Sequence, residues 1–289
     1  MASSRVWLIT GASSGFGLLL AKHAASRGER VIAASRNPEK LRLDDVAGIR
    51  TAKLDPSQTL EEIKAAMKDI VAIYGTIDIV VNNAGYVQTG ILEEVTPEDT
   101  FRQFQVNAFG PLNVYRAALP YLREKKAGTL VTIGSMAAWY PMVSCNLYNA
   151  SKAALRWLAI GLADEVASFG IRHCLIEPGF FRTELLNPNA NIALTSPTER
   201  IPDYAEKNAT ADSNFAQFHG AQLGDPVKGV EVIYDVITSS GHATGRDLPG
   251  FFALGSDATA EISKSATQTL ADLNEWKEIS AISDFPEGQ

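Results

Sequence analysis

The chain has 289 residues, of which 46% are hydrophobic and 20% charged; this excludes a disordered or fibrous protein and fits a globular one. Its length suits one large α/β domain and no linker divides it, so we expect a single domain over residues 1–289. The net charge is -7 and the basic residues are scattered, so we expect no nucleic-acid partner.

Short runs rich in β-branched residues alternate with amphipathic stretches along the chain, which is typical of βαβ units. We therefore expect an α/β fold, with a doubly wound parallel sheet of the Rossmann type flanked by helices. The predicted strands are residues 6–9, 31–34, 51–54, 77–81, 130–133 and 174–176, with a last extended run at 247–254.

Several helices are also marked in the sequence. Thr96 is a typical N-cap and Pro97 suits the first helical position, which predicts a helix from 97 to about 126. Further helices are predicted at 226–238 and 257–276, followed by an acidic, loosely held tail at 277–289. Another helix, packed on the sheet, is indicated by apolar residues at spacings of three and four, namely Leu155, Leu158, Leu162, Val166 and Phe169.

Residues 185–224 interrupt this alternation. They are rich in Asn, Ala, Thr, Ser and Pro, with Phe215 among the few large apolar residues. Such a long insertion in a compact domain is usually a lid or a binding segment, so we expect a variable substrate lid after the sixth strand.

The sequence gives no sign of a membrane or of a metal. No apolar run approaches the roughly 20 residues of a spanning helix, and residues 1–5 do not begin a signal peptide, so a cytoplasmic location is expected. Cys145 and Cys174 are the only cysteines, which suits a reducing compartment. No metal site is expected, because the histidines are far apart and lack metal-ligand spacing: His23, His173, His219 and His242.

A glycine-rich turn joins the first strand to the next helix, in residues 10–17 (Thr-Gly-Ala-Ser-Ser-Gly-Phe-Gly). Glycines at such a turn let the backbone approach a pyrophosphate, and the helix N-terminus offers unpaired N–H groups and a positive dipole end. The spacing is Gly-x3-Gly-x-Gly. It predicts a dinucleotide ligand, although a tight strand-to-helix turn without a ligand would also use these glycines.

Arg36 follows the second strand, where a protein that prefers NAD would carry an acid to hold the ribose 2′-hydroxyl. An acid there would repel a 2′-phosphate, whereas the guanidinium of Arg36 would bind it. This position therefore favours NADP over NAD. The alternative is a solvated surface arginine.

A Tyr-x3-Lys pair, Tyr148 and Lys152, stands near the start of the helix with the apolar stripe, and Ser135 ends the strand before it. Residues four apart share a helix face, so the two side chains can lie together. A cation about 4 Å away is worth roughly 4 kcal/mol at an effective dielectric of about 20, or about three pKa units on a phenol. The phenol could then act as an acid or base, with Ser135 holding the substrate oxygen. Taken alone, the pair also fits an ordinary amphipathic helix.

In this order the motifs resemble those of the short-chain dehydrogenase/reductase family, in its single-domain branch. Five elements coincide: residues 10–17, Asn-Asn-Ala-Gly at 82–85, Asn107, Ser135 with Tyr148 and Lys152, and Pro-Gly-Phe-Phe-Arg-Thr at 178–183. Residues 5–183 match well and the remainder loosely. The resemblance implies that Tyr148 donates or accepts the proton, that Lys152 lowers the Tyr148 pKa and holds the nicotinamide ribose, and that Ser135 positions the substrate.

The resemblance also implies an NADP(H) site. Thr183 would bind the nicotinamide carboxamide, and the 82–85 turn would support the sheet beside the adenosine. The predicted cofactor-binding set is Gly11, Ser13, Ser14, Gly15, Phe16, Gly17, Arg36, Asp55, Asn83, Ala84, Gly85, Tyr148, Lys152, Pro178, Gly179, Phe181 and Thr183.

Two positions near this site involve proline. In the family the main-chain carbonyl of Asn107 holds a water that continues a proton relay from the lysine; Pro111, four residues on, cannot bond that carbonyl. We expect a kink there with the carbonyl facing water, or else a helix that breaks at residues 110–111. Asp55 would meet the adenine amino group, but Pro56 lacks the N–H that relatives often offer, so adenine recognition should lose one hydrogen bond.

The predicted substrate wall is aromatic and flexible, which favours a lipophilic, aromatic or polycyclic ketone or secondary alcohol. Trp139 and Met142 could instead be packing beneath the lid. The predicted substrate-binding residues are Ser135, Met136, Trp139, Met142, Tyr148, Leu185 and Phe215, with Phe181 also considered for the wall.

An NADP(H)-dependent ketoreductase or alcohol dehydrogenase is the first reading, because every catalytic position of the family pattern is filled: Tyr148, Lys152, Ser135 and Asn107. A non-hydride or bifunctional enzyme on the same scaffold (a dehydratase, isomerase or cyclase) and a redox-silent NADP-binding regulator are the alternatives. At the family level a homodimer or homotetramer is expected, associating through the helices predicted around residues 97–126 and 146–169.

Overall fold

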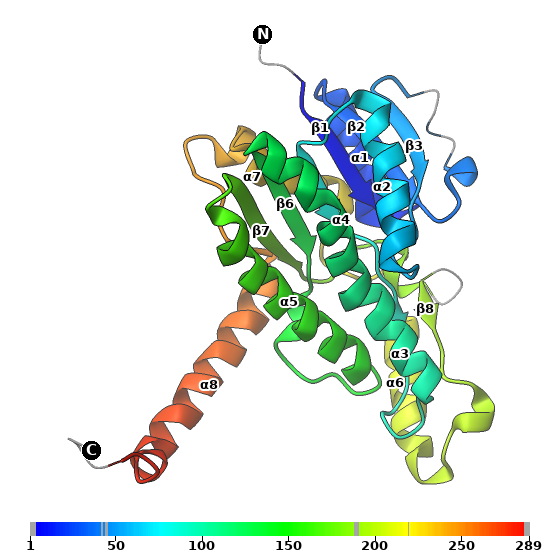
Figure 1. Cartoon of the computed structure of the whole chain (residues 1–289). Helices are drawn as coiled ribbons and strands as arrows, with labels where there is room; N and C mark the ends of the chain where they lie inside the picture. Colours follow the sequence, from blue (N-terminus) through cyan, green and yellow to red (C-terminus); the bar gives the residue numbers. More distant parts are fainter. Residues whose placement is uncertain (1–3, 42, 44–45, 188–190, 219, 286–289) are drawn as a thin grey trace.

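A seven-stranded parallel sheet, in the order β3-β2-β1-β4-β6-β7-β9, forms the centre of the molecule (Figure 1). The structure is a computed structural model, and it describes residues 4–41, 43, 46–187, 191–218 and 220–285. Because the strand order reverses direction next to β1, the carboxyl ends of β1 and β4 flank a crevice of the kind in which such sheets bind ligands. The strands are β1 Val6–Thr10, β2 Arg30–Ser35, β3 Ile49–Lys53, β4 Ile79–Asn82, β6 Gly128–Ile133, β7 Ile171–Pro178 and β9 Phe251–Leu254.

Helices cover both faces of the sheet, as the sequence predicted. Alternate residues of β1 divide the core: Trp7 and Ile9 pack with α1 and α7 on one face, and Val6 and Leu8 pack with α2, α4 and α5 on the other. This alternation is the two-residue period of a strand buried on both faces. The helices are α1 Gly15–Ser26, α2 Leu60–Tyr74, α3 Pro97–Phe104, α4 Gly110–Lys125, α5 Asn146–Ala167, α6 Ala205–Phe218, α7 Pro226–Thr238 and α8 Ser256–Ala281.

The helix predicted over 97–126 is wrong as a single α-helix, because a π-helix, Gln105–Phe109, separates α3 from α4. Its start is as predicted, since the Thr96 hydroxyl accepts a hydrogen bond from the Asp99 N–H at 3.1 Å. The Gly110 N–H bonds the Gln105 carbonyl, five residues back. Pro111 has no N–H to give, and the wider turn carries the helix past it. The alternative of a break at residues 110–111 is therefore wrong.

The predicted helix with the apolar stripe is α5, but Phe169 does not belong to the buried stripe. Leu155, Leu162 and Val166 are buried against the sheet, whereas α5 ends at Ala167 and Phe169 is 43% exposed. The spacing of three continues past the last helical residue, so periodicity alone does not locate the end of the helix.

The segment predicted as a lid contains short elements that are tied to the body. Ile192–Ala193 (β8) pairs in parallel with Val87–Gln88 (β5), and neither strand was predicted from the sequence. The buried carboxylate of Glu94 accepts hydrogen bonds from the Asn208 side chain at 2.8 Å and from the Ile201 N–H at 2.9 Å. These bonds fix α6 and the turn before it against the loop that precedes α3. Residues 188–190 and 219 of the predicted lid lie outside the described residues.

The C-terminal helix α8 extends away from the sheet (Figure 1). Its first turns are packed, with Ala258 and Ile262 buried, whereas Leu273 and Trp276 further along are about 60% exposed. The tail predicted to be loosely held from residue 277 is helical as far as Ala281. Ile279 and Ile282 continue the spacing of three that precedes Trp276, so the helix was ended too early in the prediction. Residues 286–289 of that tail lie outside the described residues.

A buried chain of side-chain hydrogen bonds links β7, β6 and α4. His173 Nε2 lies 2.9 Å from the Thr132 hydroxyl, which lies 2.8 Å from the Tyr115 hydroxyl. Burial lowers the pKa of His173 from its ordinary value of 6.5 to about 4. His173 is therefore held neutral in the folded chain.

This burial predicts a loss of stability in mild acid. Because the unfolded chain takes up a proton at His173 near pH 6.5 and the folded chain only near pH 4, stability is complete above the first value and falls as the pH drops toward the second. The shift corresponds to about 3 kcal/mol over that range. Denaturant unfolding of the wild type and of His173→Gln, which keeps a hydrogen-bonding group for Thr132, would measure it. Equal pH slopes in the two proteins would contradict the assignment.

Candidate active site

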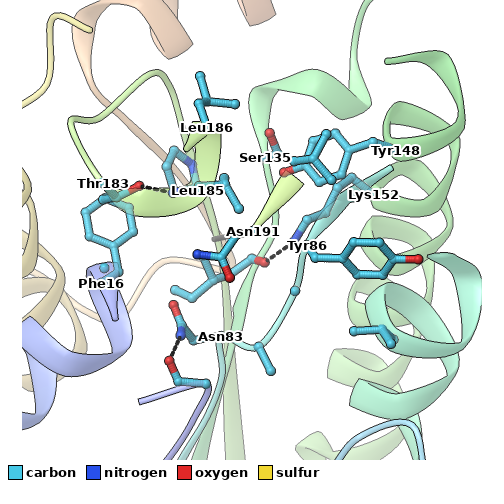
Figure 2. Close-up of a pocket in the computed structure, with 18 of the residues that line it drawn as sticks. Phe16, Asn83, Tyr86, Ser135, Tyr148, Lys152, Thr183, Leu185, Leu186 and Asn191 are labelled. Atoms are coloured by element: carbon cyan, nitrogen blue, oxygen red, sulfur yellow. Dashed lines mark hydrogen bonds between the residues drawn. The ribbon is translucent and has the colours of Figure 1, made fainter. Parts of the chain in front are cut away.

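A cavity of about 400 Å³ opens at the carboxyl ends of the central strands and is shown in part in Figure 2. Its walls come from the segments that follow β1, β2, β3, β4, β6 and β7, and from the segment predicted as a lid. Parallel strands bring these segments together at one edge of the sheet, which is where α/β proteins bind small molecules.

The glycine turn after β1 forms one end of the cavity. Gly11 and Gly15 have φ angles of 65° and 51°, in the left-handed region that favours glycine. The Ser14 side chain makes no capping hydrogen bond with α1, so the first N–H groups of this helix stay available to an anion. Of the predicted residues in the turn, Gly11, Ser13, Ser14, Gly15 and Phe16 line the cavity.

Gly17 does not line the cavity but packs beneath it. A Cβ at this position would overlap the Gly11 carbonyl and the Asn83 side-chain amide. Asn83 in turn donates to the Thr10 carbonyl at 2.9 Å, and the Thr10 hydroxyl accepts from the N–H of Ala84 at 3.1 Å. The Asn-Ala-Gly turn thus braces the glycine turn, and its residues Asn83, Ala84 and Gly85 all line the cavity.

The segments after β2 and β3 supply the next part of the wall, with Arg36, Asp55 and Pro56. Arg36 is exposed to solvent where it lines the cavity. The Asp55 carboxylate accepts from the Ser57 N–H at 2.9 Å and from the Ser57 hydroxyl at 2.7 Å, which orders this turn. Arg102 of α3 also lines the cavity and was not predicted; nothing in its sequence surroundings distinguishes it from a surface residue.

Ser135, Tyr148 and Lys152 meet at the inner end of the cavity (Figure 2). Tyr148 and Lys152 lie one turn apart on α5 and are 6% and 5% exposed, so both functional groups are taken out of water. Ser135 follows β6 closely, at the N-cap of the short helix Met136–Ala138, and its hydroxyl is hydrogen-bonded with the Tyr148 hydroxyl. The Lys152 amine donates to the Ile133 carbonyl at 3.0 Å and lies 5.9 Å from the centre of the Tyr148 ring.

The pKa of Tyr148 is not lowered, contrary to the prediction from the Tyr-x3-Lys spacing. Burial raises it above the ordinary value of 10, and the hydrogen bond with Ser135 opposes that effect. Burial also lowers the pKa of Lys152 to about 8, with the charge of Glu177 opposing. The Lys152 amine donates to the Ile133 carbonyl, and burial is the largest influence on the pKa of the Tyr148 phenol.

Asn107 lies beside Lys152, in the π-helix between α3 and α4. Its side chain is fully buried and donates to the Tyr86 carbonyl at 2.9 Å and to the Ser151 hydroxyl at 3.2 Å, and accepts from the Tyr86 N–H at 3.1 Å. A Cβ on Gly85 would lie 3.3 Å from Asn107 Oδ1 and 3.7 Å from Lys152 Nζ. Asn107 therefore joins the turn after β4 to α5 next to the lysine.

The end of β7 and the segment after it lie against the glycine turn, with Pro178, Gly179, Phe181 and Thr183 in the cavity wall. The Phe181 ring meets the Phe16 ring edge to face, with 5.0 Å between their centres. The Phe180 N–H donates to the Asp257 carboxylate of α8 at 2.7 Å. The glycine turn and the segment after β7, which are both predicted to bind the cofactor, are thus in contact through Phe16 and Phe181.

The predicted substrate wall is assembled with one exception. Met136, Met142, Leu185 and Phe215 line the cavity, but Trp139 does not. The Trp139 indole N–H donates instead to Glu177 at 2.6 Å, behind the Ser135 turn. Further lining residues that were not predicted from the sequence include Tyr86, Val87, Ala137, Tyr140, Cys145, Phe180, Leu186, Asn191 and Ile192.

Some of these missed residues had a usable signal. Tyr86 directly follows the Asn-Ala-Gly motif, and Tyr140 and Cys145 lie between Ser135 and Tyr148, where the wall was expected. Ile192 reaches the cavity only because β8 pairs with β5, and no local pattern announces that pairing. Among the described residues, no three His, Cys, Asp or Glu side chains gather as metal ligands would, and no helix has the length and apolarity needed to cross a membrane.

Comparison with known proteins places this geometry in a defined class. The family model described as short chain dehydrogenase matches residues 5–192. A short-chain dehydrogenase from Streptomyces avermitilis has a solved structure that is 36% identical, covers 98% of this chain and 100% of its own, and superposes with a TM-score of 0.85. The oxidoreductase BOA17 of Botryotinia fuckeliana is 30% identical over 97% of this chain and 99% of its own length.

A gluconate 5-dehydrogenase from Burkholderia cenocepacia, solved with NADP and tartrate, is 31% identical over 63% of this chain and 74% of its own, with a TM-score of 0.60. The family model and these relatives therefore define an oxidoreductase that acts on a carbonyl or an alcohol. The chain belongs to the short-chain dehydrogenase/reductase family.

Proposed function

We propose that this chain is an NADP(H)-dependent oxidoreductase that reduces a ketone or aldehyde of a lipophilic, aromatic or polycyclic small molecule, or oxidises the corresponding secondary alcohol. The observation that carries the proposal is the meeting of Ser135, Tyr148 and Lys152 at the inner end of a cavity whose other end is the glycine turn. One end offers uncapped helix N–H groups to a pyrophosphate, and the other offers a proton donor.

In this proposal the cofactor supplies or accepts the hydride, and the chain handles the proton. Tyr148 gives its hydroxyl proton to the substrate oxygen in reduction and takes it back in oxidation. Ser135 donates a hydrogen bond to the same oxygen as charge develops on it. Lys152 holds the nicotinamide ribose and stabilises the phenolate with its charge. Asn107 keeps the turn after β4 against α5, and its main-chain carbonyl is the proposed end of the proton relay.

The residues around the cavity fit a dinucleotide. The glycine turn, Ser13, Ser14 and Phe16 would hold the pyrophosphate, and Asn83 to Gly85 would lie beside the adenosine with Asp55. Pro178, Gly179, Phe181 and Thr183 would hold the nicotinamide. Support comes from the NADP in the gluconate dehydrogenase relative and in a serine dehydrogenase structure that is 25% identical, with a TM-score of 0.68.

NADP is preferred over NAD in this proposal because of Arg36, and the preference is testable. We expect Arg36→Ala to weaken NADPH about tenfold to a hundredfold and NADH by less than threefold, since only NADPH carries the 2′-phosphate that pairs with the guanidinium. Dissociation constants from cofactor fluorescence would measure both. Arg27→Ala, which removes another arginine away from the cavity, is the control. Equal weakening of the two cofactors would contradict the role of Arg36.

The lipophilic substrate class rests on the inner wall of the cavity. Val87, Ala137, Cys145, Leu186 and Ile192 form a buried apolar cluster together with Tyr148, and Met142, Leu185 and Phe215 pack against it. An apolar wall of this kind favours an apolar substrate group over a charged one. A relative from Bacteroides thetaiotaomicron, 34% identical over 70% of this chain and 72% of its own, is named 3-ketodihydrosphingosine reductase. That name describes the reduction of a ketone, which supports the proposed reaction.

Residues 185–224 are the proposed substrate lid, because they contribute Leu185, Asn191 and Phe215 to the cavity wall. The proposal treats them as an insertion in one domain over 1–289. Cys145 and Cys174 are both free and buried, which supports a reducing, cytoplasmic setting. We also expect a homodimer or homotetramer, supported by exposed apolar side chains such as Trp157 on α5. Light scattering of the purified protein would measure the molar mass.

The function is tested by following the oxidation of NADPH, with NADH as control, across a panel of aromatic, polycyclic, aliphatic and sugar ketones. We expect turnover with NADPH and the highest kcat/KM for the lipophilic ketones. Tight NADPH binding with no turnover of any ketone, or of the matching alcohols with NADP⁺, would contradict the proposal.

A further inference from the structure

A carboxylate that no motif singled out lies directly behind the catalytic turn. Glu177 is the next-to-last residue of β7, and its side chain is fully buried. One oxygen, Oε2, accepts from the Trp139 indole at 2.6 Å and from the Arg156 guanidinium at 3.0 Å. The other, Oε1, is buried without a hydrogen-bond partner among the described residues. A buried carboxylate that is only half satisfied is costly to keep, which makes a functional reason worth seeking.

Glu177 contacts both ends of the turn that carries Ser135. A Cβ on Gly134 would lie 2.9 Å from Glu177 Cγ and 3.2 Å from Oε1, so the residue before Ser135 rests against the carboxylate. Ser135 caps the short helix Met136–Ala138, and Trp139, which ends it, is the indole that donates to Glu177. The carboxylate therefore limits how far this turn, and the Ser135 hydroxyl with it, can move.

The same carboxylate faces α5, which presents Lys152 and Arg156 one turn apart. The charge of Glu177 acts on Lys152 and favours its ammonium form. Around Lys152 are also Tyr148 from its own helix, the Ile133 carbonyl from β6 and Asn107 from the π-helix. Arg156 lies over the Trp139 ring, 4.2 Å from its centre. The carboxylate of Glu177 thus interacts with two cations, with Arg156 through a hydrogen bond and with Lys152 through its charge.

The outer side of this cluster is closed by α8 and β9. Ser265 of α8 donates to the Trp139 carbonyl at 2.5 Å, and the Phe251 ring of β9 lies 5.0 Å from Arg156. Asp257 and Glu261 of α8 act on Tyr140, the neighbour of Trp139. Glu177 is therefore the carboxylate that bears on Lys152 within the described chain.

We propose that Glu177 is a positioning residue for the proposed oxidoreductase: its carboxylate fixes the Ser135 turn through Trp139 and Gly134, and its negative charge keeps Lys152 in the ammonium form that Tyr148 needs. The proposal rests on the function proposed above only for its kinetic consequence. Its electrostatic part concerns the folded chain alone and can be measured without cofactor or substrate.

The test compares Glu177→Gln with the wild type. The amide keeps the shape and can still accept from Trp139, but the charge is lost. With lysine labelled by a heavy carbon isotope at Cε, the Lys152 resonance, assigned with Lys152→Arg, reports its titration by NMR. In the wild type the pKa is about 8. We expect it to fall by about one unit in Glu177→Gln, and an unchanged Lys152 titration in the folded variant would overturn the proposal.

The kinetic readout follows the same variant. The alkaline limb of kcat for ketone reduction should move to lower pH by about one unit, while KM for NADPH stays within about twofold, because Glu177 does not line the cavity. An unmoved limb would overturn the link from Glu177 to the proton step. If no ketone is turned over by the wild type, the proposed function fails while the NMR result still decides the electrostatic part.

Trp139→Phe is the matched control, since it removes the indole N–H but leaves the carboxylate. We expect it to reduce kcat several-fold without moving the Lys152 titration. Glu177→Asp keeps the charge on a shorter side chain and serves if Glu177→Gln does not fold: Lys152 should then titrate near its wild-type value while kcat falls. A Lys152 titration lowered as far in Trp139→Phe as in Glu177→Gln would assign the effect to packing and overturn the charge role.

Discussion

Replacing Tyr148 by phenylalanine is expected to reduce kcat by about a thousandfold or more, because general acid catalysis by a positioned side chain contributes roughly 10²–10⁴ to a rate and the phenol is the proposed proton donor. The ring stays in place and only the hydroxyl is removed, so the dissociation constant for NADPH should change by less than about twofold. Single-turnover oxidation of NADPH and cofactor fluorescence would measure the two quantities.

Tyr140→Phe is the control for this variant. Tyr140 lines the same cavity and is partly buried, and burial raises its pKa to about 12. It is not one of the three proposed catalytic residues Ser135, Tyr148 and Lys152. Its loss should change kcat by less than about tenfold. Turnover in Tyr148→Phe close to that of the wild type would show that another group gives the proton, and the mechanism proposed here would be wrong.

The second large effect is expected for Gly17→Ala. The added Cβ would overlap the Gly11 carbonyl and the Asn83 amide, so the glycine turn must shift away from the turn after β4. Displacing two helix N–H groups from a pyrophosphate at about 1.5 kcal/mol each would weaken NADPH about a hundredfold. Titration of NADPH binding by fluorescence or calorimetry would measure this loss.

Gly161→Ala is the matched control, because nothing lies within 4 Å of a Cβ at this position in α5. In the interior of a helix alanine is favoured over glycine by about 1 kcal/mol, so this variant should be as stable as the wild type or more stable, with unchanged NADPH affinity. If Gly17→Ala binds NADPH as tightly as Gly161→Ala does, the pyrophosphate does not lie at the glycine turn.

Much of the site was predictable because its residues belong to motifs that are recognised from a few adjacent positions in the sequence. The glycine turn, the Asn-Ala-Gly turn and the Tyr-x3-Lys pair each depend on a backbone conformation or a helical spacing that operates over a few residues. The parallel sheet then brings them together, since every one of them follows or faces the carboxyl end of a central strand. Trp139 failed as a pocket residue because one position along a tight turn reverses the direction of a side chain, so Tyr140 faces the cavity instead.

The sequence by itself determined the alternation of the central strands with helices and the dinucleotide-type turn, because these are set by local backbone preference and by hydrophobic period. The proposed group of Ser135, Tyr148 and Lys152 was indicated by its spacing and by the resemblance of the motifs to those of the family. Only the tertiary structure decided the direction of the Tyr148 and Lys152 pKa shifts, the pairing of β8 with β5 and the place of Glu177 behind Ser135. These features depend on burial and on contacts between segments far apart in the chain, which local patterns do not encode.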